Sequence, residues 1–402
     1  MTSADLTVAP SAGARTHATW YCWLLSGLYV FSVNVQGNVV PFLQEAFTMS
    51  YRAVSLHSSA TATGIILVGL FGERVAARLG RRRSLWLAAG GFSGGGILLC
   101  IAPAPWASIL ACFVTGLLGA LAPAVTPVVL ADLHGPRRAA AYAGQGIVAY
   151  CYGLAAPLLS GLAIWAGLGW RAAVLAGAFV GIAVGLHFRR LGSAELGAGP
   201  DAASAAHAGA RRESLPPAYW AFWSMVVASV SLECGIVFWA PAYLERVVGF
   251  SAAGAAAAGF PFGALIGRIA LRTLVARVVL RRLLITSLAV VALGFVLYWG
   301  IGPPTVAVVG VFILGLGIGP TFPLGIEFCV GAAPKARDLA SMRLAIAFGL
   351  ALLAAPIALG ALADVMTLGP AHLALPVLIL AAFITFFVGE ALQRRAALVV
   401  AE

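Results

Sequence analysis

One carboxylate, that of Glu233, stands in an apolar run, residues 219–244, that holds no other charged side chain. Burial disfavours the ionised form of a carboxyl, so such a group tends to hold a proton. If the two sides of a membrane wet it in turn, it can load the proton on one side and release it on the other. We predict that Glu233 couples protons or contacts a substrate. The alternative is a neutral carboxyl that is hydrogen-bonded to its own helix and has no function.

Three more ionisable residues, Arg268, Glu327 and Arg343, lie inside apolar segments. At a rise of about 1.5 Å per residue, Glu327 and Arg343 lie near the same membrane face. We expect them to form an ion pair that acts as a gate, with Arg268 as a neighbour or alternative partner. In the other interpretation, Arg268 or Arg343 binds an anionic substrate, because arginine matches the geometry of a carboxylate.

Uncharged polar residues gather in the segment "SVNVQGNVVP", which holds Asn34, Gln36 and Asn38. Asn34 and Asn38 are four residues apart and share one helical face. We expect them to bind substrate and to oppose Glu233 across a cavity. Further substrate-binding candidates, for which packing is an equal alternative, are His57, Gln145, Tyr152 and Trp239.

The elements that position these residues follow from composition. Hydrophobic residues make up 61% of the 402 residues and charged residues 10%, against roughly 25% charged residues in soluble domains. Apolar segments of about twenty residues predict membrane-spanning helices, and no alternation typical of a barrel is present. The sequence therefore predicts an all-α polytopic membrane protein. Its twelve expected helices are residues 19–43, 54–76, 84–102, 106–131, 138–166, 170–190, 217–244, 252–276, 283–301, 305–331, 338–365 and 371–393.

The net charge of +11 arises from arginines that gather in every second loop. Positive charge accumulates on the cytoplasmic side of membrane proteins, so both termini are expected there, in a bacterial inner membrane. Basic residues placed by topology, without interleaved aromatics, argue against a nucleic-acid partner. The six cysteines lie in apolar segments without metal-ligand spacing, so neither disulfides nor a metal site is expected.

The chain repeats itself once. "AAPLLSGLA" at 155–163 matches "AAPIALGAL" at 354–362, and "GALAPAVTP" in the fourth helix matches "GLGIGPTFP" in the tenth. Duplicated six-helix halves are typical of transporters, whose substrate lies between the halves. The expected division is an N-terminal tail 1–18, a bundle 19–191, a cytoplasmic linker 192–216, a bundle 217–393 and a C-terminal tail 394–402.

Several motifs complete a resemblance. "RVAARLGRRRSL" follows the second helix, "ADLHGPRR" closes the fourth and "LGWR" opens the sixth. With the six-plus-six plan, the chain resembles the major facilitator superfamily over essentially its whole length, although Ala77 replaces the usual acidic residue of the signature loop. The resemblance implies a cytoplasmic gating network made of Arg81, Arg82, Asp132 and Arg138.

The resemblance also implies a monomeric secondary transporter of a small organic solute, driven by a proton gradient and without a cofactor. "GQGIVAYCYGLAAPLLSG" in the fifth helix resembles the antiporter motif of exporters and favours efflux of drug-like or metabolic compounds. The alternative is proton-coupled uptake or exchange of an organic anion through Arg268 and Arg343. An intramembrane enzyme is a remote alternative, because no catalytic or ATP-binding motif is found in the sequence.

Overall fold

The computed structural model describes residues 12–401 apart from 136–137, 193, 197–214, 252–253, 255–258, 276, 300–302 and 335–336. All regular elements within these ranges are helical. The first half of the chain contributes α1 (Ala12–Ala46), α2 (Tyr51–Leu79), α3 (Arg81–Ile101), α4 (Pro105–Gly119), α5 (Leu121–His134), α6 (Arg138–Trp165) and α7 (Trp170–His187). After a short 3₁₀ turn, η2 (Ala194–Leu196), the second half contributes α9 (Pro217–Arg246), α11 (Phe260–Leu274), α12 (Leu280–Tyr298), α13 (Pro304–Ala332), α14 (Arg337–Met366), α15 (Leu368–Ala371) and α16 (Ala374–Ala401).

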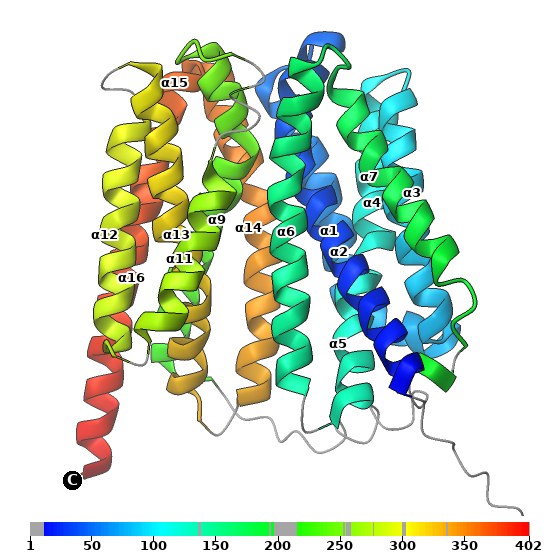
Figure 1. Ribbon diagram of the computed structural model, residues 1–402. Coiled ribbons are helices and arrows are strands. Elements are labelled where there is room, and N and C mark those ends of the chain that lie inside the picture. Colours follow the sequence, from blue (N-terminus) through cyan, green and yellow to red (C-terminus); the bar gives the residue numbers. More distant parts are fainter. Residues whose placement is uncertain are drawn as a thin grey trace, which may run out of the picture.

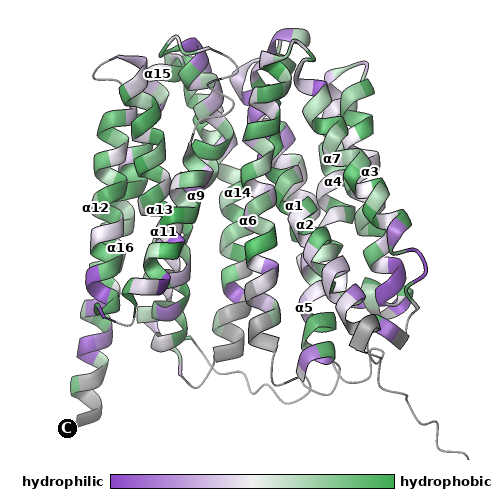
Figure 2. Cartoon of the chain, in the orientation of Figure 1, coloured by the Kyte–Doolittle hydropathy of each residue, from purple (hydrophilic) through white to green (hydrophobic). Residues whose placement is uncertain are grey.

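The helices run lengthwise, side by side, between two ends of the molecule (Figure 1). We call the end where α1 and α9 begin the termini end, and the opposite end, where α2 begins, the far end. Hydrophobic residues cover the sides of the helices, and hydrophilic residues concentrate toward the ends (Figure 2). Large apolar side chains such as Leu70, Ile147, Phe179 and Leu380 are exposed on those sides. Such a surface is stable against lipid and not against water, so the predicted all-α membrane fold is confirmed.

Ten of the described helical segments are long and apolar enough to cross a membrane, against twelve expected. The two that do not qualify are α1, which carries Asn34, Gln36 and Asn38, and α11, of which fifteen residues are described. The expected helix 252–276 extends beyond the described part of the chain. The expected helix 106–131 is divided into α4 and α5 at Ala120, yet the two pieces form one span, Pro105–His134.

Glycines allow the backbones of α11 and α13 to touch. A Cβ added at Gly315 or Gly319 of α13 would collide with backbone carbonyl oxygens of α11. The same holds in reverse, since a Cβ at Gly263 or Gly267 of α11 would collide with carbonyl oxygens of α13. No hydrophobic effect drives helices together in lipid, so their association depends on close packing of this kind. This contact holds α11 in place as one wall of the central region.

One set of contacts between the two halves joins α2 to α14, and we call it the α2–α14 seam. The carboxylate of Asp364 accepts hydrogen bonds from the amides of Tyr51 and Arg52 at 2.6 and 2.9 Å. Nearer the middle, Ser58 and Ser59 donate to the carbonyl oxygens of Leu352 and Leu353. The Leu352 carbonyl is free to accept because Pro356, four residues later, has no amide hydrogen.

A second set of contacts, the α1–α9 seam, reaches the far end as well. Arg246, the last residue of α9, donates to the side-chain oxygen of Gln44 at 2.5 Å and to the carbonyl oxygen of Pro41 at 3.0 Å. Lower down, Gly37 of α1 lies against the backbone of Val237 in α9. The described hydrogen bonds between the halves therefore hold them together from the middle of the molecule to the far end.

Candidate functional site

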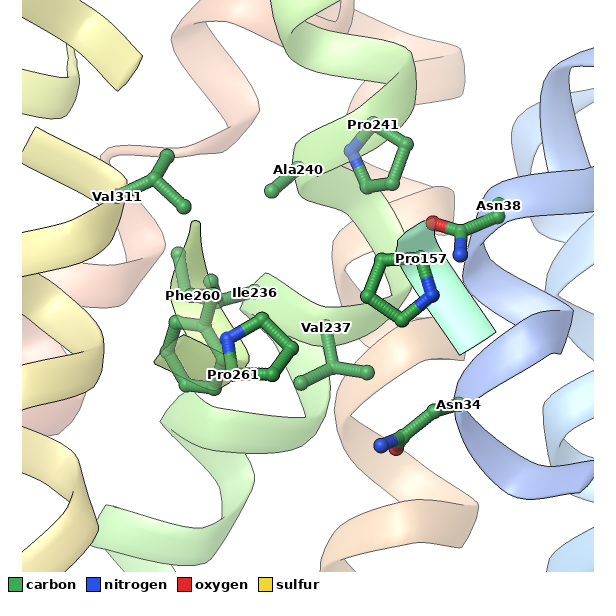
Figure 3. A pocket seen from close by; sticks show the side chains of 10 residues that line it. All are labelled: Asn34, Asn38, Pro157, Ile236, Val237, Ala240, Pro241, Phe260, Pro261 and Val311. Carbon is green, nitrogen blue, oxygen red and sulfur yellow. The ribbon is translucent and has the colours of Figure 1, made fainter. Parts of the chain in front are cut away.

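A small pocket lies in the middle of the molecule between helices of both halves. Figure 3 shows Asn34 and Asn38 of α1 on one side of it and apolar side chains of α9, α11 and α13 on the other. Its lining residues are Asn34, Asn38, Pro157, Ile236, Val237, Ala240, Pro241, Phe260, Pro261 and Val311. The site is thus mostly apolar with two carboxamides, as is common for sites that bind small organic molecules.

The two predicted asparagines are therefore brought together at one pocket. Each amide nitrogen makes one long hydrogen bond, 3.4 Å, to α6: Asn34 to the carbonyl oxygen of Gly153 and Asn38 to the hydroxyl of Ser160. A carboxamide can make four hydrogen bonds. The remaining donor and acceptor positions of both side chains are available to a ligand in the pocket.

Glu233 lies on α9 one turn from Val237 and two turns from Ala240, toward the termini end. Residues at these spacings share a helical face, so its side chain projects from the same face of α9 as the pocket lining. The side chain is half-buried. Among the described residues, the Glu233 carboxylate has no hydrogen-bond or ion-pair partner. This is the unpaired intramembrane acid that the sequence led us to expect.

Arg268 on α11 reaches across to α6, from the second half to the first. Its guanidinium carbon lies 4.5 Å from the centre of the Tyr150 ring, in a cation–π contact. The Nε atom is buried and has no hydrogen-bond partner within the described ranges. The arginine is therefore held by an aromatic face while its donors stay free.

Two other predicted binding residues belong to hydrogen-bond networks inside the first half. Gln36 is buried and donates to the hydroxyl of Thr61 at 2.8 Å. His57 is 1% exposed; its Nδ1 lies 2.7 Å from the carbonyl oxygen of Val54 and its Nε2 lies 2.8 Å from the hydroxyl of Ser108. Both ring nitrogens of His57 are thus engaged, as is the amide nitrogen of Gln36, and neither residue lines the pocket.

The remaining uncharged candidates pack between helices as well. Gln145 donates to Ser26 at 2.6 Å and to Thr126 at 2.8 Å, which ties α6 to α1 and α5. Trp239 is fully buried, and its indole donates to the carbonyl oxygen of Pro356 at 3.0 Å. Tyr152 is half-buried with its ring against Gly27 of α1. None of the three lines the pocket.

Glu327 and Arg343 form no ion pair in this structure, so the expected gate between them stays a prediction. Both side chains are exposed, and neither has an ion-pair partner among the described residues. The backbone carbonyl of Arg343 instead accepts from the indole of Trp223 at 2.9 Å. Exposed charges at a helix end are already well solvated, so pairing contributes little free energy.

The expected gating network at the termini end is partly assembled, but within one half. Arg81 pairs with Asp132 at 2.6 Å and donates to the carbonyl oxygen of Leu196 in η2 at 3.0 Å. Arg82 donates to the carbonyl oxygen of Arg189. The side chain of Arg138 lies outside the described residues. These contacts fasten the chain after α7 to the first half rather than joining the two halves.

Sequence reasoning missed several residues of the central region. Tyr150, which receives Arg268, and the apolar Phe260 and Val311 of the pocket were not singled out. The sequence did contain a signal for Tyr150. It lies two helical turns before Pro157, on the same face of a helix that also carries the binding candidates Gln145 and Tyr152. Asp364 of the α2–α14 seam had no signal, because an acid at an exposed helix end is ordinary.

Fold and site together define a polytopic membrane protein with a pocket between two halves of its chain, the arrangement of a membrane transporter. The family model of the Major Facilitator Superfamily matches residues 22–356. The chain belongs to the Major Facilitator Superfamily, and it is a secondary transporter of small solutes rather than an enzyme. No curated protein matches the sequence.

Solved structures agree in fold. A bacterial homologue of the human lysosomal transporter Spinster, in an inward-facing and unoccupied conformation, has a TM-score of 0.78 at 16% identity, over 96% of this chain and 99% of that chain. The nucleoside transporter NupG has a TM-score of 0.72 at 12% identity, over 94% and 99%. The xylose transporter XylE from E. coli, in a partially occluded inward-open conformation, has 0.71 at 16%, over 93% and 98%.

Proposed function

We propose that this protein is a proton-coupled transporter of a small organic solute, with Glu233 as the proton carrier. The observation that supports it most directly is an unpaired carboxylate on the pocket-facing side of α9, halfway along a membrane-spanning helix. Intramembrane acids are energetically costly and are retained mainly where they bind ions or substrates. Glu233 projects into the region where two halves meet, so each conformation can wet it from a different side.

The cycle in this proposal is alternating access. The bundles 19–191 and 217–393 rock as units joined by the linker 192–216, in a monomer whose pocket lies within a single chain. The tails 1–18 and 394–402 are cytoplasmic, in a bacterial inner membrane, on the strength of the arginine distribution. With that orientation, the two seams close the periplasmic side, so the structure corresponds to an inward-facing state. Two of the three solved structures named above are described in inward-facing or inward-open conformations.

Asn34 and Asn38 are the proposed solute contacts on the first half, because they line the pocket and have unused hydrogen-bonding positions. The side chains of Gln36, His57 and Gln145, which bond to neighbouring helices and do not line the pocket, have a different role in this proposal. They keep α1, α2, α4, α5 and α6 in register, so that the asparagines point into the pocket.

The direction of transport depends on how proton and solute share the site. Export requires them to occupy it in turn, and uptake along the proton gradient requires them to load together. The glycine-rich motif of α6 is the observation in favour of export. In its support, Gly144 and Gly153 lie against Trp23 and Asn34 of α1, and Pro157 lines the pocket.

The test uses the purified protein in liposomes with an imposed pH gradient and a panel of radiolabelled organic solutes. Accumulation of a solute against its gradient measures coupling, and exchange of labelled for unlabelled solute without a gradient measures transport alone. We expect Glu233→Gln to abolish gradient-driven accumulation while exchange continues. A residue with a merely structural role would lower both rates together.

The matched control is Glu390→Gln. Glu390 is also an acid within a spanning helix, but it is paired with Arg281 at 2.9 Å in the second half, away from the pocket. Its substitution should leave the ratio of accumulation to exchange unchanged. Accumulation at the wild-type level in Glu233→Gln would refute Glu233 as the proton carrier.

A further inference from the structure

Below the pocket, toward the termini end, three of its walls carry polar side chains at one level. In each wall the polar residue lies seven positions from a residue that lines the pocket: the pairs are Tyr150 with Pro157, Glu233 with Ala240, and Arg268 with Pro261. Seven residues make two helical turns within about 20°, so each polar residue shares a face with its partner.

The three helices place these residues on the same side of the pocket. Both α6 and α9 rise toward the far end, so Tyr150 and Glu233 precede their pocket residues, whereas α11 descends and Arg268 follows Pro261 (Figure 1). Two turns correspond to about 10 Å along a helix axis. Tyr150, Glu233 and Arg268 thus form a layer, which we call the polar layer, about 10 Å from the apolar pocket.

Within the polar layer the acid and the arginine are not paired with each other. No ion pair of Arg268 is formed with any described residue, and its buried Nε has no acceptor. Burying an arginine donor without an acceptor is costly, so a group that supplies the acceptor during the transport cycle gains that free energy. The Tyr150 ring holds the guanidinium by its face and leaves the donor edge free, which suits an oxyanion.

We propose that the pocket and the polar layer together bind an amphipathic organic anion whose carboxylate is held by Arg268. This inference rests on the proposed transport function and names its substrate class. The apolar part of the anion occupies the pocket against Ile236, Phe260 and Val311, and the two levels set its length at about 10 Å. Arg343, the other arginine expected to bind an anion, is exposed at the helix end and does not line the pocket.

The position of Glu233 in the same layer sets the sign of coupling. An ionised Glu233 repels a carboxylate at Arg268, whereas a protonated Glu233 does not. Proton and anion therefore load together and leave together, which is symport. An inward proton gradient then drives uptake, the reverse of the export that the α6 motif favours.

Equilibrium binding to the purified full-length protein tests the substrate class without any proton gradient. The probes are the carboxylates phenylacetate, phenylbutanoate and phenylhexanoate, each paired with the uncharged alcohol of the same length. We expect the wild type to bind at least one carboxylate about tenfold or more tightly than its alcohol. Arg268→Gln should remove this preference, and Arg268→Lys should keep part of it, since lysine retains the charge but not the planar fork.

Two further variants separate the binding site from general effects of charge. Arg272→Gln removes an exposed arginine one turn further along α11 and should leave the preference intact. Tyr150→Leu removes the aromatic face that holds the guanidinium and should weaken carboxylate binding. Thermal unfolding of each variant verifies that it folds.

The proposal is overturned if the wild type binds none of the carboxylates, or binds carboxylates and alcohols equally. It is also overturned if Arg268→Gln keeps the preference. Binding of carboxylates that weakens as the pH rises in the wild type, but not in Glu233→Gln, would support joint loading. Failure of proton coupling in liposomes, with carboxylate binding intact, would refute the proposed function of Glu233 and leave the substrate class standing.

Discussion

A methyl group placed in the α2–α14 seam should open the far end. A Cβ at Gly360 would lie 2.6 Å from the carbonyl oxygen of Tyr51 and 3.1 Å from the hydroxyl of Ser55. The carbonyl oxygen of Tyr51 belongs to the backbone of α2 and cannot rotate away from the added methyl group. The two helices must therefore separate by several tenths of an ångström. Gly360→Ala therefore destabilises the state with a closed far end and leaves a state in which these helices have parted unaffected.

The expected magnitude follows from the cost of overpacking. One added methyl group against backbone costs about 1–3 kcal/mol, which corresponds to a shift of roughly 5–150-fold in the equilibrium between the two states. The higher helix propensity of alanine does not change the equilibrium between the two states, because α14 is helical in both of them. A far end that is closed in nearly all molecules of the wild type would become open in a measurable fraction.

The shift can be measured with spin labels at two exposed far-end positions, Arg52 on α2 and Val365 on α14, in a background where the exposed Cys151 is replaced by serine. We expect a longer distance population to grow in Gly360→Ala. The matched control is Gly317→Ala, whose Cβ would lie 2.7 Å from the carbonyl oxygen of Ser287, in a contact within the second half. An unchanged distance distribution in Gly360→Ala, or an equal change in the control, would refute the reasoning.

Three other substitutions test contacts described above. Asp364→Ala removes the acceptor of two amides at an exposed helix N-terminus; we expect the same far-end opening at about 1 kcal/mol, and a wild-type distance distribution would contradict it. Leu196→Ala removes a fully buried side chain of η2; at about 2–3 kcal/mol it should lower the thermal unfolding midpoint, and an unchanged midpoint would show that the docking of η2 adds no stability. Gln145→Leu deprives Ser26 and Thr126 of their donor and should cost about 1–2 kcal/mol in the same measurement, unless the hydroxyls re-pair without loss.

The class of fold could be predicted from the sequence because it depends on length and hydrophobicity alone. Apolar segments of membrane-spanning length, and a repeat that pairs Pro157 with Pro356, suffice for a polytopic transporter fold. The boundaries were less predictable. Ala120 divides the fourth expected helix with an ordinary backbone conformation, which leaves no trace in a sequence.

The site was predictable where residues are unusual for their surroundings. Glu233, Asn34 and Asn38 are polar in segments that should be apolar. The structure brings the two asparagines to one pocket, and Glu233 lies one helical turn from the pocket residue Val237. The partners of charged residues were not predictable in this way, because pairing depends on how helices rotate and lean against one another. Arg268 faces Tyr150 rather than Glu327, a relation that only the packing of α11 against α13 and α6 determines.

The described ion pairs lie within single halves: Arg81 with Asp132 in the first, and Glu390 with Arg281 and Arg394 in the second. The seams that join the halves use hydroxyl, backbone-amide and guanidinium donors, and their two charged side chains, Arg246 and Asp364, face neutral partners. Separating the halves therefore breaks no ion pair and leaves no buried charge without its counter-ion. An unpaired buried charge would oppose the movement of the halves. Interactions of this kind are short in range and little screened, so the equilibrium between the two states should change little with ionic strength.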